Sequence, residues 1–349
     1  MNQIYWRLLV CSVLLFSADF LHLTAGEDKL TILPDESVED FRIGIIGLDT
    51  SHSVAFTEIL NSKECLAGLE KYHVVAAYPH GSRDIESSVS RIPQYTKQVE
   101  EMGVEIVSSI SELLERVDGV LLETNDGRLH LEQVLPVLKA GKPVFIDKPM
   151  AASLADVIAI FMAAEHYGTP AFSTSPLRYG EETQAVRNGA IGKVLGCDTY
   201  SPCLLEPTHP DLFWYGVHGV EALFTIMGTG CESVQCNHLP DADVVVGKWK
   251  DGRLGTFRGT RTGQRHYGGI AFGEKSDKLI GQDAGYRPLV VDIVHFFQHG
   301  RTLVKPEETI EIFAFMQAAQ ESKLLDGASV SLEYVLQKAR SEAKTKQIW

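Results

Sequence analysis

RIGIIGLDTSHSVAFTEILN, residues 42–61, decides the fold of this chain. Its first part, residues 42–47, is a short isoleucine-rich run that ends in glycine, which is typical of a buried strand. Apolar residues then recur at helical spacing at Val54, Ala55, Ile59 and Leu60. The stretch therefore predicts a strand, a tight turn and a helix.

The same alternation of strand and helix continues along the first part of the chain. Consecutive strands joined by helices pair in parallel, because a right-handed crossover of that length returns the chain to the same edge of the sheet. We therefore expect an α/β fold with a Rossmann-like, doubly wound parallel sheet over residues 41–150. The further strands are expected at residues 73–78, 104–107, 118–123 and 143–147, and the helices at 91–103, 110–117 and 129–140.

After residue 190 the pattern changes to short strands that are separated by turn residues. This predicts a second α+β domain over residues 151–349 with a mostly antiparallel sheet, whose last helices can pack back on the first domain. Strands are expected at residues 197–205, 232–239, 243–249, 254–261 and 267–274, and helices at 288–297 and 307–325.

The amino terminus differs from the rest of the chain. Arg7 precedes an apolar run of nine residues, 8–16, and small residues follow at Ala25 and Gly26. This is the anatomy of a signal peptide over residues 1–26, followed by an acidic linker over 27–40. The apolar run is too short to span a bilayer of roughly 30 Å. We expect an exported protein, periplasmic or extracellular, with an uncleaved anchor as the alternative.

Charge and cysteine content argue against a nucleic-acid-binding protein and against a disulfide-rich protein. The formal net charge is -14 and no basic stripe is present, which argues against a nucleic-acid partner. Five cysteines remain after the leader, an odd number without a C-x-x-C pair. Buried free thiols are therefore expected rather than a disulfide framework, with Cys231 and Cys236 as the nearest pair in sequence.

The turn after the first strand is abnormal for a dinucleotide-binding fold. Such a fold usually has the spacing G-x-G-x-x-G, so that the backbone can approach a pyrophosphate at the helix N-terminus. Here only Gly47 is kept, while Asp49 and His52 replace the second and third glycines. A carboxylate about 4 Å from a phosphate charge costs roughly 4 kcal/mol at an effective dielectric of 20. In the alternative interpretation, Asp49, Thr50 or Ser51 caps the helix with its own oxygen.

The end of the second strand lacks the acidic residue that usually holds the adenosine ribose. Residues 78–83 read YPHGSR instead. Ser82 and Arg83 would suit the 2′-phosphate of NADP, so the sequence leaves NAD and NADP open.

Several downstream motifs carry a family resemblance. IDKP at residues 146–149 resembles the E-K-P motif of the Gfo/Idh/MocA (glucose-fructose oxidoreductase/inositol dehydrogenase) family, and residues 118–130, DGVLLETNDGRLH, resemble its strand and T-P-N-x-x-H loop. Arg178-Tyr179 and residues 191–194 also match family positions. The resemblance implies an NAD(P) cofactor, a carbohydrate-like substrate and a homo-oligomer.

The resemblance also implies roles for individual residues. Lys148 is expected near the nicotinamide and the substrate, and His218 matches the histidine of the family motif D-x-G-x-H, in which Trp214 replaces the aspartate. Both are candidates for proton transfer, and Asp211, seven residues before His218, is a candidate partner. The residues expected to bind the cofactor are Gly47, Leu48, Asp49, Ser51, His52, Thr124, Asn125, Asp147, Lys148 and Pro149.

For the substrate, we expect contacts from Arg178, Trp214, Tyr215 and His218. Glu206, His209, Asp211 and His218 are also possible metal ligands, but their spacing fits a substrate-facing polar cluster better, and no metal is predicted. The leading hypothesis is an NAD(P)-dependent oxidoreductase that acts on a sugar, cyclitol or related polyol. The alternative is an exported carbohydrate-binding or pseudo-enzyme module that has lost dinucleotide binding.

Overall fold

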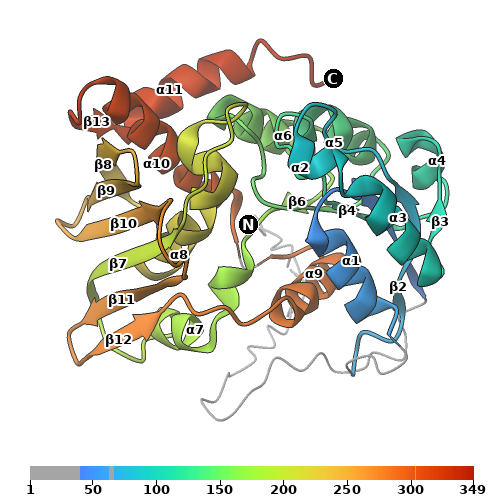
Figure 1. Ribbon diagram of the computed structural model, residues 1–349, viewed down its shortest axis with the longest axis horizontal. Helices are drawn as coiled ribbons and strands as arrows, with labels where there is room; N and C mark the ends of the chain where they lie inside the picture. The colour runs from blue at the N-terminus through green and yellow to red at the C-terminus, as the bar shows by residue number, and fades with distance from the viewer. Residues whose placement is uncertain (1–39, 63–66, 303) are drawn as a thin grey trace, which may run out of the picture. The chain divides into compact units, whose positions relative to one another are not determined.

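The computed structural model describes residues 40–62, 67–302 and 304–349. The proposed signal peptide, almost all of the linker and Cys65 lie outside these residues. Figure 1 shows two sheets with helices packed around them.

The first sheet has six strands in the order β3-β2-β1-β4-β5-β6, and every pair in it is parallel. The order reverses between β1 and β4, which is where ligands bind in sheets of this type. This confirms the predicted doubly wound sheet, although β6 extends it beyond the expected domain boundary at residue 150. The strands are β1 (Phe41–Ile46), β2 (Tyr72–Tyr78), β3 (Glu105–Ile106), β4 (Gly119–Leu122), β5 (Val144–Ile146) and β6 (Ala171–Phe172).

Helices cover both faces of this sheet, because the side chains of successive strand residues point to opposite faces. Ile45, Leu121 and Phe145 pack with helices α1, α3 and α9. Ile46 and Leu122 pack with helices α4, α5 and α6 on the other face. The helices are α1 (Ser51–Leu60), α2 (Glu86–Val89), α3 (Ile92–Glu101), α4 (Ile110–Leu114), α5 (His130–Lys139), α6 (Leu154–Tyr167) and α9 (Arg287–His299).

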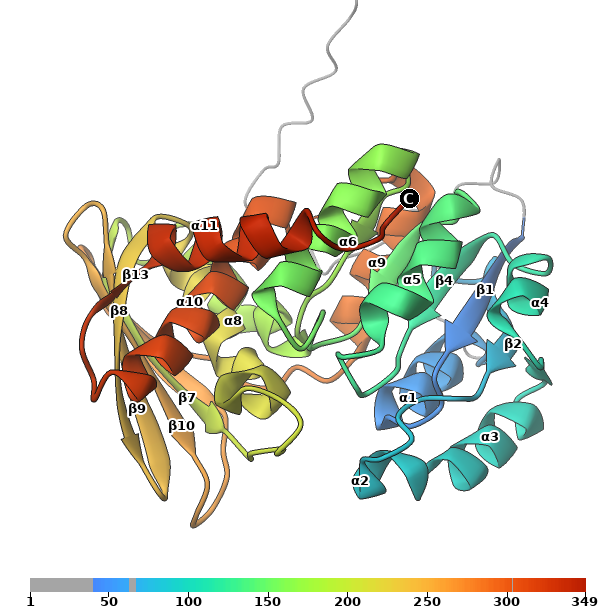
Figure 2. The ribbon, with the colours of Figure 1, turned by 90° about the horizontal axis from the view of Figure 1, so that it is seen from above.

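The second sheet has the order β12-β11-β7-β10-β9-β8-β13. Its pairs are antiparallel except for β7 with β10, which confirms a mostly antiparallel sheet. Figure 2 shows α8 and α10 against one face of it. The strands are β7 (Val194–Pro202), β8 (Cys231–Leu239), β9 (Ala242–Trp249), β10 (Leu254–Thr260), β11 (Gly268–Gly273), β12 (Asp277–Ile280) and β13 (Val330–Ser331).

The remaining helical segments follow β6 along the chain. A 3₁₀ turn, η1 (Pro176–Tyr179), follows β6, and a π-helical segment, η2 (Leu212–Gly216), leads directly into α8 (Val217–Met227). Among the described helices, none combines the length and the apolar character that a membrane crossing needs. Cys197, Cys203, Cys231 and Cys236 are buried free thiols. The other helices are α7 (Glu181–Arg187), α10 (Pro306–Leu324) and α11 (Leu332–Ala343).

Candidate active site

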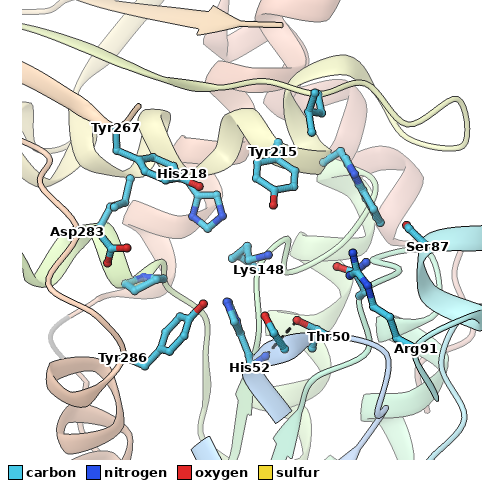
Figure 3. Close-up of a pocket in the computed structure, with 16 residues that line it drawn as sticks. Thr50, His52, Ser87, Arg91, Lys148, Tyr215, His218, Tyr267, Asp283 and Tyr286 are labelled. Carbon is cyan, nitrogen blue, oxygen red and sulfur yellow. Dashed lines mark hydrogen bonds between the residues drawn. The ribbon is translucent and has the colours of Figure 1, made fainter. Parts of the chain in front are cut away.

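A cavity of about 280 Å³ lies at the C-terminal ends of β1, β4 and β5. Figure 3 shows its side chains pointing toward a common centre. One wall comes from the first sheet and its helices, and the other from η1, η2 and α8. Of the residues predicted for the site, this cavity is lined by Ser51, His52, Asn125, Lys148, Trp214, Tyr215 and His218.

Lys148 projects into the cavity from the turn after β5. It is 7% exposed, and its Nζ lies 4.0 Å from Asp147 Oδ2 and 5.9 Å from the centre of the Tyr215 ring. An ammonium group over an aromatic face is stabilised by the ring quadrupole. Burial and these two neighbours fix the amine where it can reach a bound molecule.

His218 stands in the first turn of α8 and faces the same cavity. Its Nδ1 lies 2.8 Å from Ser175 Oγ, and the rings of Tyr215 and Tyr267 are 5.7 and 5.8 Å away. Burial, and next the charge of Lys148, lower the pKa of His218 well below its ordinary value. The imidazole is therefore neutral at pH 7 and able to accept a proton.

This shift predicts a pH-dependent stability. Below pH 6.5 the unfolded chain binds a proton at His218 that the folded chain does not bind, so stability falls as the pH falls. The contribution of this residue approaches about 1.4 kcal/mol per pH unit. Urea unfolding between pH 5 and 7 measures this contribution. It is the difference between the wild type and His218→Gln in the slope of the free energy of unfolding against pH. The exposed His266→Gln variant should keep the wild-type slope, and an unchanged slope in His218→Gln would contradict the assignment.

Asp49 does not line the cavity. Its carboxylate is fully buried and accepts hydrogen bonds from the backbone N–H groups of Ser82, at 3.1 Å, and Asn125, at 2.9 Å. Burial raises the pKa of Asp49, and these two donors oppose the shift. The carboxylate is therefore held between the loops after β2 and β4. It does not face the cavity, so it does not repel a phosphate there as the sequence led us to expect.

The cap of α1 is Thr50, one of the three candidates. Its side chain accepts a hydrogen bond from the backbone N–H of His52, at 3.4 Å. Gly47, which precedes this turn, has φ +90°, and a Cβ there would lie 2.4 Å from Thr124 Oγ1. The glycine that the sequence keeps is therefore the one that the close contact with Thr124 requires.

The cavity wall beside α1 suits an anion. Thr50 and Ser51 line it at the helix N-terminus, and the other residues are Ser87 in α2, Arg91 at the start of α3 and Asn125 in the loop after β4. A helix N-terminus favours negative charge, and a guanidinium pairs well with phosphate oxygens. These residues fit the phosphate of a nucleotide, and Lys148 lines the same cavity.

The predicted NADP contact does not join this cavity. Arg83 lines a separate cavity of about 410 Å³ together with Tyr78, His80 and residues of α4 and α5. Ser82 instead donates its hydroxyl to Asp126, at 2.8 Å. Arg83 and Ser82 therefore do not contribute to the cavity wall beside α1, where the basic residue is Arg91.

Two buried acidic residues lie close to Lys148 and His52. Glu123 and Asp147 are the first residues after β4 and β5, and both are fully buried. Burial, and next the charge of Asp147, raise the pKa of Glu123 well above its ordinary value. Burial alone would raise the pKa of Asp147 too, but His52, with Nδ1 at 2.9 Å, and Lys148 hold it below its usual range.

Other predicted site residues lie away from the cavity. Asp211 forms ion pairs with Lys323 and, at 3.8 Å, His238, so it is not positioned as a partner of His218. Arg178 is fully buried and paired with Glu221 and Glu308. The following predicted residues also do not line the cavity: Gly47, Leu48, Thr124, Asp147 and Pro149.

The metal alternative from the sequence is not supported by the placement of its residues. Asp211 gathers with His238 and Asp243, while His209 lies 3.5 Å from Asp126. Conversely, sequence reasoning missed several residues that line the cavity, because they come from loops and helix ends without a motif. They are Ser87, Arg91, Leu204, Tyr267, Asp283 and Tyr286.

Comparison with known proteins identifies oxidoreductases as relatives of this chain. Residues 41–174 match the model of the GFO_IDH_MocA oxidoreductase family, described as an NAD-binding Rossmann fold. A 1,5-anhydro-D-fructose reductase of Ensifer adhaerens is 32% identical over 29% of this chain, and an inositol 2-dehydrogenase of Saccharopolyspora erythraea is 27% identical over 43%. The aligned stretches span 32% and 48% of those relatives.

Solved structures share the architecture along nearly their whole length. A probable dehydrogenase from Thermotoga maritima superposes with a TM-score of 0.69 at 22% identity, covering 84% of this chain and 99% of that protein. A scyllo-inositol dehydrogenase from Lactobacillus casei, solved with NAD(H) and scyllo-inositol, gives 0.67 at 16% identity, covering 84% and 100%. At these identities the likeness shows the shared fold. Residues 41–174 therefore match the Rossmann domain of the Gfo/Idh/MocA oxidoreductase family, and the two-sheet architecture of the chain matches solved dehydrogenase structures.

Proposed function

We propose that the chain is an NAD(P)-dependent oxidoreductase that oxidises or reduces a sugar, cyclitol or related polyol by hydride transfer. One observation carries the proposal: Lys148 and His218 meet in one cavity with the anion-binding wall of Thr50, Ser51 and Arg91. The curated relatives that act on anhydrofructose and inositol support the substrate class.

The cofactor, when bound, supplies the nicotinamide ring that accepts or donates the hydride. The phosphate-bearing part would be held by the N-terminus of α1, Arg91 and Asn125. Lys148 and His218 then act on the substrate hydroxyl. The neutral imidazole of His218 accepts the hydroxyl proton, and Lys148 holds the same oxygen through its N–H groups. Ser175 orients the imidazole through Nδ1.

Aromatic side chains give the cavity its preference for a ring-shaped substrate. Trp214, Tyr215, Tyr267 and Tyr286 line it, and the carboxyl group of Asp283 lies between Tyr267 and Tyr286. Sugar and cyclitol rings present apolar C–H faces and polar edges, which suits such a lining.

A cofactor titration tests the proposal against the carbohydrate-binding alternative. Binding of NADH or NADPH to the purified chain, followed by nicotinamide fluorescence, is expected in the micromolar to millimolar range that is typical of enzyme ligands. If neither nucleotide binds at millimolar concentration while calorimetry detects a polyol, the chain is a binding module. Because the carboxylate of Asp49 is held by the loops after β2 and β4 and does not line the cavity, it does not oppose nucleotide binding, so the first outcome is expected.

We also propose that the protein is exported through its amino-terminal signal peptide. The support is the charged start, apolar run and small residues within residues 1–26. Expression of the full chain with its natural start, followed by mass spectrometry of the exported and retained fractions, tests this. The expected product lacks about 25 residues, and an uncleaved product in the membrane fraction would favour the anchor instead.

A further inference from the structure

Three side chains that carry possible metal-ligand atoms, His52, Glu123 and Asp147, lie close together, and the register of the first sheet explains why. Strands β4 and β5 are in register, with Leu122 opposite Ile146, so Glu123 and Asp147 occupy neighbouring places at the sheet edge. Both lie two residues after side chains that face α1, so both face α1 as well. His52 comes from that helix. One ligand atom from each of the three residues lies within 4.8 Å of the others.

The carboxyl group of Glu123 lacks the partners that a buried polar group needs. Neither oxygen of Glu123 has a hydrogen-bond partner among the described residues, although the side chain is fully buried, whereas Asp147 has His52 Nδ1 at 2.9 Å. Buried polar atoms are nearly always satisfied by protein, water or an ion. Lys148 Nζ, 4.0 Å from Asp147 Oδ2, supplies one positive charge for two carboxylates.

A second cluster in the described part of the chain provides the contrast. Asp211, His238 and Asp243 also bring three donor atoms together. There each carboxylate has its own cation, because Lys323 pairs with Asp211 and Arg261 pairs with Asp243 at 2.6 Å. That cluster is neutralised by the protein itself, whereas the cluster of His52, Glu123 and Asp147 is not.

The imidazole of His52 is also held in position to act as a ligand. Its ring stacks on Phe56, with centroids 5.5 Å apart, and meets the edge of Tyr286 at 4.7 Å. Its Nδ1 is thereby directed at Asp147, 2.9 Å away. A ring fixed in this way loses little conformational entropy when it binds an ion.

We propose that His52, Glu123 and Asp147 form a binding site for a divalent transition-metal ion such as Zn²⁺ or Mn²⁺. One imidazole nitrogen and two carboxylate groups are a donor set that such ions accept, with the remaining positions left to water. The ion would lie at the base of the cavity, next to Lys148, and balance the second carboxylate. The site does not depend on the oxidoreductase activity, so the two proposals can fail separately.

The test uses the full mature chain without a purification tag, after treatment with EDTA and removal of the chelator. Calorimetric titration with ZnCl₂ and with MnCl₂ at pH 7.5 is expected to show one strong site per chain for at least one of the ions, together with a rise in the melting temperature. Glu123→Gln keeps the shape and removes the charge, so it should weaken binding by more than the roughly 10–100-fold that follows loss of a second-shell group. Asp211→Asn, which removes a carboxylate from the neutralised cluster, should bind as the wild type does.

Two results would overturn the proposal: no binding to the wild type at millimolar Zn²⁺ or Mn²⁺, or binding by Glu123→Gln with wild-type affinity. If Glu123→Gln does not fold, the site is tested instead by adding Co²⁺ to the metal-free wild type. Visible absorption bands from one equivalent of Co²⁺ support the site, and their loss in His52→Gln assigns the nitrogen ligand. An infrared band from a protonated Glu123 carboxyl that persists with added metal would show that a proton, rather than an ion, balances the charge.

Discussion

Lys148→Ala is expected to lower kcat for polyol oxidation by about 10²–10⁴-fold, the range that a positioned proton-transfer or hydroxyl-binding group contributes. The change corresponds to roughly 3–5 kcal/mol of barrier. The physical reason is the position of Nζ, which is buried, faces the cavity and stands over the Tyr215 ring. Stopped assays of nicotinamide absorbance with an inositol or an anhydrosugar as the substrate measure the effect.

Two further variants separate chemistry from folding. Lys193→Ala removes a lysine that does not line the cavity and should keep wild-type activity. Lys148→Arg keeps the charge but changes the donor geometry, so it should keep nucleotide binding better than turnover. If Lys148→Ala folds, binds nucleotide and turns over like the wild type, Lys148 has no part in the reaction.

The elements around the site could be predicted because their signals are local. The isoleucine-rich run before Gly47 and the helical spacing after it identify β1 and α1, which the structure has at Phe41–Ile46 and Ser51–Leu60. The same holds for the strand before Asp147. Lys148 and His218, which motifs single out, are both in the cavity.

The direction of Asp49 could not be predicted, because its partners are distant in sequence. Ser82 lies 33 residues away and Asn125 lies 76 residues away, so only the folded chain shows that their backbone N–H groups occupy the carboxylate. Arg178 illustrates the same limit, since an arginine near a family motif is equally compatible with a ligand contact and a buried ion pair. Glu123 did carry a signal, because an acidic residue directly after a buried parallel strand points to the sheet edge where sites form.

The arginine that we expected to contact substrate is instead predicted to stabilise the fold. Arg178 is fully buried and joins η1 to two helices, with Nε 2.8 Å from Glu221 Oε1 on α8 and Nη1 2.8 Å from Glu308 Oε1 on α10. Burial opposes the charged form, but the two carboxylates outweigh it and raise the pKa of Arg178 above its ordinary value. Arg178→Met would leave both carboxylates without this partner, so we expect a loss of about 3–5 kcal/mol in the free energy of unfolding.

A matched control is available in Arg187, which also pairs with Glu308, at 3.6 Å, but is 31% exposed. Arg187→Met should cost less than about 1 kcal/mol, because a partly solvated pair contributes little. The triple variant Arg178→Met, Glu221→Gln, Glu308→Gln should regain much of the lost stability, since it removes the orphaned charges together with the arginine. Urea denaturation measures all three. A loss in Arg178→Met no larger than that in Arg187→Met would mean that water reaches Glu221 and Glu308, and that the arginine does not hold α8, and with it His218, against η1.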